Sequence, residues 1–205
     1  SEIWSFLDEE NNPNQKRSQL LLELALRIVK SEIPPHVINF YHDPFSQQKD
    51  IIKFWGNYQQ ACQEANELSL SLFKETPAKL CQKSPLGKKL PNALYIHHSA
   101  VPFLALPLQF YERLARSYLT ELIEPTLIKF QIYQEKISYL IYPDFDQDPH
   151  PALRTSIQVD LSTGKNTRRD YHTRENPPIL HRKETFVTPD YPYYKTFLEL
   201  TKKEE

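Results

Sequence analysis

Glycine is scarce in this 205-residue chain, and its three copies, Gly56, Gly87 and Gly164, lie far apart. Phosphate-binding loops and dinucleotide fingerprints need clustered glycines to bring backbone N–H groups onto a phosphate. The sequence therefore excludes nucleotide chemistry of both kinds. Methionine is absent and the chain begins with serine, so we expect a processed chain or a piece of a longer protein.

Cysteine is also scarce, and long apolar runs and an excess of charge of one sign are absent. Two cysteines without a CxxC pattern argue against a disulfide scaffold and a thiolate zinc site, and we expect the buried thiols of a cytoplasmic protein. No apolar run approaches the length of a membrane span, and no signal-peptide pattern opens the chain, so no membrane partner is expected. The net charge of −1 excludes nucleic-acid coating by bulk charge.

The composition instead predicts a folded α+β domain spanning 1–205. Hydrophobic residues make up 40% of the chain, which is enough to build a core. The 17 prolines concentrate after residue 76 and favour extended, turn-rich chain there. We expect a helical part over 1–75 and a sheet-containing part over 90–205.

Four segments carry helical patterns. Residues 15–31 are rich in strong helix formers, and residues 47–75 repeat apolar side chains at three- and four-residue steps, with Gly56 as a weak point inside one long helix. Residues 107–123 begin with a proline in the first turn and predict a further helix, and residues 193–203 predict a helix that closes the chain.

The second half of the chain switches to a two-residue period. Residues 126–133 and 136–142 alternate around a short turn, residues 155–161 and 166–172 do so around a turn at Gly164, and residues 94–96 suit a short additional strand. Because the strands follow one another without intervening helices, they predict an antiparallel meander of about four strands. This order also excludes a Rossmann-type methyltransferase domain.

Two segments hold clustered ionisable residues. In the first, Asp144, Asp146 and His150 offer ligands that suit a divalent cation, or else they cap turns in a polar loop. In the second, a double proline precedes His181 and Glu184 and favours an extended chain with charges on alternate sides. Such a chain could present its basic side chains to an anion, or it could be an edge strand whose charged residues form ion pairs with their neighbours. Nothing in the spacing requires a metal site.

A third pair, His97 and His98, is expected to point to opposite faces of a strand, which favours a core or hydrogen-bonding role over joint metal ligation.

Basic residues gather in a fourth region. Residues 152–188 contain seven lysines and arginines against four acids, and four more lysines lie between 79 and 89. Such a surface suits a phosphate backbone, with nearby aromatic rings for base stacking, or it is a solvated face of mixed charge. The candidate nucleic-acid-binding residues are Arg154, Lys165, Arg168, Arg169, Arg174, Arg182 and Lys183.

Several segments resemble the family of DNA phosphorothioation-associated putative methyltransferases. They are FWGNYQQAC at 54–62, LPNALYIHHSA at 90–100, YLIYPDFDQDPHPAL at 139–153, NPPILHRKETFV at 176–187 and LTKKEE at 200–205. The resemblance implies bacterial DNA modification or phage defence, with other DNA-modification proteins as partners. It also implies that S-adenosylmethionine is bound by a fused or partner domain in longer members. Since this chain has no such motif, we expect no cofactor in it and transfer no catalytic residue.

Three functional hypotheses follow, and the sequence does not decide whether the chain is an enzyme. The first is an accessory module that binds DNA through its basic residues. The second is a metal-dependent phosphodiester hydrolase or nuclease that uses Asp144, Asp146, His150, His181 and Glu184. The third is a protein-interaction scaffold that uses the helical part.

Overall fold

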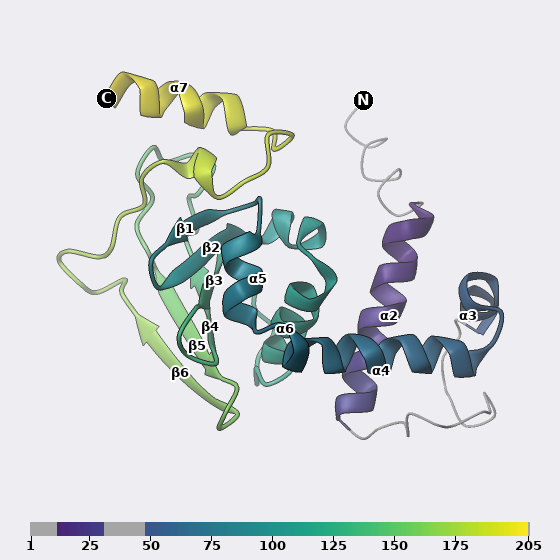
Figure 1. The fold of residues 1–205 in the computed structure, drawn as a ribbon. Helices are drawn as coiled ribbons and strands as arrows, with labels where there is room; N and C mark the ends of the chain where they lie inside the picture. Colours follow the sequence, from purple (N-terminus) through teal and green to yellow (C-terminus); the bar gives the residue numbers. More distant parts are fainter. Residues whose placement is uncertain (1–11, 31–47, 205) are drawn as a thin grey trace.

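The computed structural model describes residues 12–30 and 48–204 and confirms the α+β class (Figure 1). The α-helices are α2 (Pro13–Val29), α3 (Gln48–Trp55), α4 (Tyr58–Lys74), α5 (Pro77–Lys83), α6 (Leu106–Arg116) and α7 (Tyr194–Glu204). Two short 3-10 helices are η2 (His98–Phe103) and η3 (Lys183–Thr185). No helix in these ranges is both long enough and apolar enough to cross a bilayer.

The strands form one antiparallel meander of six members in the order of the chain, rather than the four that the sequence pattern predicts. They are β1 (Lys88–Leu90), β2 (Ala93–His97), β3 (Leu127–Gln131), β4 (Lys136–Ile141), β5 (Thr155–Asp160) and β6 (Lys165–Asp170). The two additional strands are β2, which includes the expected segment 94–96, and β1, which no sequence pattern predicts.

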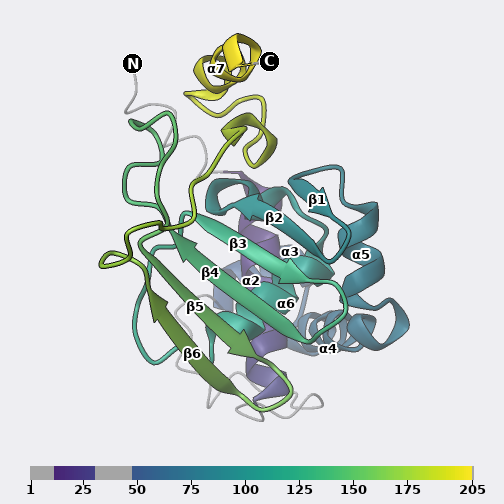
Figure 2. The ribbon, with the colours of Figure 1, turned by 90° about the vertical axis from the view of Figure 1, so that its left-hand side faces the viewer.

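Helices cover one face of this sheet, whereas no helix of the described residues lies over the middle of its opposite face (Figure 2). The covered face carries the apolar side chains of alternate strand positions, such as Leu94, Phe130 and Ile137, which are fully buried against Leu108 and Tyr111 of α6. A second apolar core joins α2, α3 and α4 to the other side of α6. The two cores explain why strand alternation and helical periodicity are both clear in the sequence.

The C-terminal segment covers one end of the otherwise open face. Leu127 and Leu140 of the sheet pack there against Leu180, Phe186 and Phe197. Burial of these side chains holds η3 and α7 beside the sheet, as Figure 1 shows for the yellow end of the chain. The rest of the open face is polar and bounded by this cluster.

Two helix predictions are wrong in extent. The expected single helix over 47–75 is two helices, because Gly56 adopts a positive φ of 77° and the Asn57 side chain then caps α4 by accepting from the Gln60 N–H. The helix expected over 107–123 ends at Arg116. Beyond it, the Tyr118 carbonyl accepts from the Asn166 side chain instead of continuing the helical ladder.

The segment expected to be extended around residues 181–184 is also different. Arg182 has a left-handed backbone with φ of 57°, and η3 begins directly after it. The predicted alternation of side chains is lost at this point, because a residue in the left-handed region does not continue an extended backbone.

Candidate functional site

The open sheet face contains a groove of about 320 Å³ with cations and aromatic rings along its wall. One row of paired residues crosses the sheet here, because antiparallel pairing aligns residues on adjacent strands, and all of its members except Lys88 line the groove. That row, taken in the order β1 to β6, is Lys88, Tyr95, Lys129, Ser138, Gln158 and Thr167.

Two cation–ring pairs flank this groove. The Lys129 ammonium lies 5.3 Å from the centre of the Tyr95 ring, and the Arg174 guanidinium lies 4.6 Å from the centre of the Tyr171 ring. Arg169 lines the same groove from the exposed edge strand β6. We name these five residues, Tyr95, Lys129, Arg169, Tyr171 and Arg174, the sheet-face cluster. They provide positive charge beside flat apolar rings.

Arg168, adjacent to Arg169 on β6, lies on the opposite side of the sheet, because side chains alternate along a strand. Arg168 pairs across β5 with the buried Ile157, whereas Arg169 pairs with Ser156 of the groove. Arg168 is neutralised there by Glu121 at 2.7 Å and by Asp170 at 3.2 Å. Hydrogen bonds to these two carboxylates raise the pKa of Arg168. The two arginines therefore differ in chemistry although they are adjacent in sequence.

Three other predicted basic residues are exposed but lie outside the groove. Arg154 and Lys165 are exposed, and Arg182 lies 3.6 Å from the Glu184 carboxylate. Of the seven candidates, the groove and its cation–ring pairs thus include only Arg169 and Arg174. Lys129 joins them without having been predicted, because a single lysine in an apolar strand gives no charge-cluster signal.

Lys183 is the clearest correction to the predicted basic surface. Its side chain is buried, and its ammonium donates to the carbonyls of Phe145 and Asp148, both at 2.7 Å. The same ammonium lies 4.0 Å from the centre of the Phe197 ring. Burial lowers the pKa of Lys183. This lysine therefore fixes the 144–148 loop to the C-terminal segment and is not presented to a ligand.

The five residues of the predicted hydrolase site do not converge. Asp144 is exposed on its loop, and the Asp146 carboxylate accepts a hydrogen bond from the Tyr191 hydroxyl at 2.8 Å. Glu184 is buried and accepts from the Thr201 hydroxyl. The structure does bring His150 and His181 together, with ring centres 4.5 Å apart. The carboxylate beside them belongs to Glu204, which no pattern in the sequence singles out.

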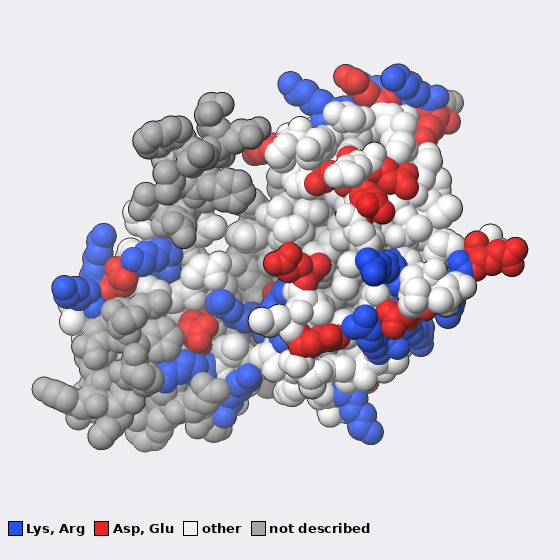
Figure 3. All heavy atoms as spheres, turned by 180° about the vertical axis from the view of Figure 1, so that it is seen from behind, with Lys and Arg blue, Asp and Glu red and all other residues white. Residues whose placement is uncertain are grey.

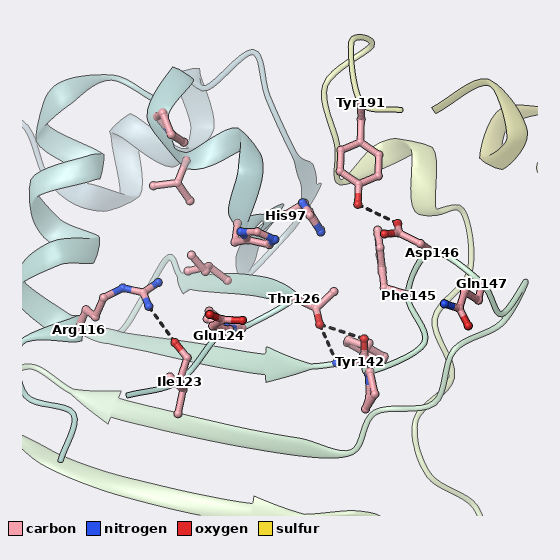
Figure 4. A pocket seen from close by; sticks show the side chains of 16 residues that line it. His97, Arg116, Ile123, Glu124, Thr126, Tyr142, Phe145, Asp146, Gln147 and Tyr191 are labelled. Carbon is pink, nitrogen blue, oxygen red and sulfur yellow. Dashed lines mark hydrogen bonds between the residues drawn. The ribbon is translucent and has the colours of Figure 1, made fainter. Parts of the chain in front are cut away.

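A larger pocket of about 650 Å³ lies between η2, the strand ends and the 142–147 loop (Figure 4). Asp146 and Tyr191 form one wall of it, and Arg116 and Glu124 lie toward the other end. The Arg116 guanidinium already bonds to the Glu112 carboxylate and the Ile123 carbonyl, so its charge is partly satisfied by the protein.

His97 and His98 both line this pocket, contrary to the expectation that they point apart. Their ring centres are 4.3 Å apart because β2 ends at His97 and the chain turns into η2. The His97 Nδ1 accepts from the Ser99 N–H, which leaves the proton of the neutral ring on Nε2. Burial lowers the pKa of His97 to about 3 and also lowers that of His98. Both rings are therefore neutral at pH 7, so the charged groups of this pocket are Arg116, Glu124 and Asp146 rather than the histidines.

Comparison with known proteins adds no family to this description. The chain matches no family model, and neither the curated proteins nor the solved structures contain a significant match.

Proposed function

We propose that this chain is a DNA-binding accessory module of a bacterial DNA-modification system of the phosphorothioation-associated type, and that its open sheet face binds single-stranded DNA. The observation that supports this most directly is the sheet-face cluster. The system itself is proposed from the sequence resemblance, with methyl transfer left to a fused or partner domain.

The sheet-face cluster suits a single strand for two chemical reasons. Lysine and arginine neutralise backbone phosphates and release counterions, while tyrosine rings offer a surface on which unpaired bases stack. Tyr95 and Tyr171 are half-buried, so their rings are held in place rather than free to turn. A polar floor made by Ser138 and Gln158 would accommodate different bases without selecting one.

Affinity for a fluorescent single-stranded 12-mer tests this function, measured by mobility shift and anisotropy at low salt. The variant Lys129→Gln/Arg169→Gln removes two charges from the groove, and we expect it to weaken binding about tenfold, as loss of about 1.4 kcal/mol requires. Lys79→Gln/Arg168→Gln is the matched control: it removes the same charge, Lys79 lies on α5, and Arg168 faces away from the groove.

Equal loss in both double variants would show that only net charge matters, and it would contradict a groove on the sheet face. Tighter binding of a duplex than of the single strand would contradict the stacking role. Absence of binding to either DNA would overturn the proposal and leave the scaffold hypothesis, which size measurement with candidate partner proteins addresses. The metal-dependent hydrolase is not proposed, because only His150 and His181 of its five predicted residues come together.

A further inference from the structure

Three segments that are distant in sequence meet at a second cluster of ionisable side chains. His150 follows the acidic loop after β4, His181 precedes η3, and Glu204 lies in the last turn of α7. One ring nitrogen of each histidine and one carboxylate oxygen of Glu204 all lie within 4.8 Å of one another. The His150 Nε2 is 2.7 Å from the Glu204 Oε1.

The second nitrogen of His150 gives a separate observation on the same imidazole ring. Its Nδ1 is buried and has no hydrogen-bond partner among the residues that the structure describes. A buried, unsatisfied polar atom costs free energy, so proteins rarely keep one without a reason. The imidazole therefore has more electron-pair capacity than its protein neighbours use.

We infer that His150, His181 and Glu204 bind a Zn²⁺ ion that fastens the end of α7 to the body of the protein. Two imidazoles and a carboxylate form a common ligand set for zinc, at distances of about 2.0–2.2 Å from the ion. Ligand atoms that lie within 4.8 Å of one another need only small side-chain movements to reach that geometry. Magnesium and calcium fit less well, because they prefer oxygen ligands.

The position of the site indicates what the ion does. His181 and Glu204 are exposed, so residues 12–30 and 48–204 supply three ligands and leave the fourth position of a tetrahedral ion open on this exposed side. The site joins α7 to two loops beyond the contacts that Phe197 and Thr201 already make. It involves no residue of the sheet-face cluster, so zinc binding and DNA binding are separate properties that fail separately.

Titration of the full chain with ZnCl2, followed by calorimetry and thermal unfolding, tests this site. We expect one equivalent of Zn²⁺ to bind and to raise the unfolding temperature, because a ligand that binds only the native state stabilises it. MgCl2 should produce neither effect. The two cysteines are buried and do not offer a competing surface site. Co²⁺ should give the visible absorption of a tetrahedral complex with nitrogen and oxygen ligands.

The variants His181→Ala and Glu204→Gln should each lose this binding, and both keep the fold because the two side chains are exposed. The exposed His172, two residues after β6, provides the matched control, and His172→Ala should bind zinc as the native chain does. No saturable binding by the native chain would overturn the inference. Equal zinc binding in native chain, His181→Ala and Glu204→Gln would overturn it too, by placing the ion elsewhere.

Discussion

The environment of His97 makes it sensitive to acid. Its ring is 3% exposed, stacks on Phe145 at 4.8 Å and meets the Tyr191 ring edge at 4.9 Å. A charged imidazolium is poorly solvated among these rings, and the nearby His98 disfavours a second positive charge. The native protein therefore keeps His97 neutral well below the pKa of about 6.5 of a histidine in an unfolded chain.

We expect this histidine to destabilise the fold between pH 6.5 and pH 3. As the pH falls through 6.5, the unfolded chain binds a proton at residue 97 and the native protein does not, so the equilibrium moves toward unfolding. The free energy of unfolding should fall by up to about 1.4 kcal/mol per pH unit from this one group. Above pH 7 the group contributes no pH dependence.

Denaturant unfolding of His97→Asn between pH 4 and pH 7 measures the effect. The free energy of unfolding should depend less steeply on pH in this variant than in the native protein, because unfolding takes up nearly one proton fewer. Altered packing shifts the free energy of unfolding at every pH and leaves this slope unchanged. His172→Asn serves as the control because His172 is exposed. Parallel slopes for the native chain and His97→Asn would mean that His97 titrates normally in the fold.

Neighbouring residues also show how far the sequence can predict the site. Strand alternation alone could have separated Arg168 from Arg169, because adjacent side chains in a strand face opposite sides. It could not have identified Lys183 as buried, since the left-handed backbone at Arg182 ends the extended chain on which that reasoning depends. Lys129 was missed because its role comes from the pairing of β2 with β3.

At the scale of elements, two glycines with positive φ connect neighbouring elements, and they differ in how much space a side chain would have. Gly56 separates α3 from α4 with a φ of 77°, and a Cβ there would meet only the Gln60 side chain at 3.6 Å. Gly87 leads into β1 with a φ of 82°, and a Cβ there would lie 2.5 Å from the Tyr95 carbonyl oxygen of β2. A residue with a Cβ would be strained at either position, but only at Gly87 would it also displace the backbone of β2.

We therefore expect Gly87→Ala to destabilise the protein more than Gly56→Ala. The left-handed conformation alone costs about 1–2 kcal/mol for a residue with a Cβ, which is the loss expected at Gly56. At Gly87 the overlap with the Tyr95 carbonyl adds to this cost, because β1 must separate from β2. Midpoints of guanidinium unfolding compare the two variants. Equal midpoints would show that β1 shifts freely and that its pairing contributes little.

Element prediction succeeded where the signal is local. The paired strands β3 to β6 and helix α7 lie within one or two residues of the predicted ranges, because periods of 2 and 3.6 reflect which face is buried. The failures have other causes. Gly56 and the Asn57 cap divide the expected helix, and the apolar period that runs through both α3 and α4 does not show this break. β1 is too short to show a period without its partner β2.

At the scale of the whole molecule, the two faces of the sheet have different roles. One face builds the core with α6, and the other remains polar and carries the sheet-face cluster. Acidic and basic side chains are mixed over the surface seen from behind, in line with the near-zero net charge (Figure 3). Attraction of DNA by the overall field is therefore weak, and any affinity has to come from a few local contacts.

The number of local phosphate contacts predicts how steeply DNA affinity depends on salt concentration. Three cations of the sheet-face cluster, Lys129, Arg169 and Arg174, could each neutralise one phosphate of a single strand. The logarithm of the affinity should then fall with the logarithm of salt concentration with a slope of about −2, since each phosphate contact on a single strand contributes about −0.7.

Binding isotherms at four or five salt concentrations give this slope for each protein. Lys129→Gln/Arg169→Gln should reduce it to about −0.7, because one contact remains. Lys79→Gln/Arg168→Gln should retain the native value. A steep native slope that the groove variant leaves unchanged would place the phosphate contacts on another surface. A flat native slope would show that stacking on Tyr95 and Tyr171 dominates, and phosphate neutralisation by the groove would then be wrong.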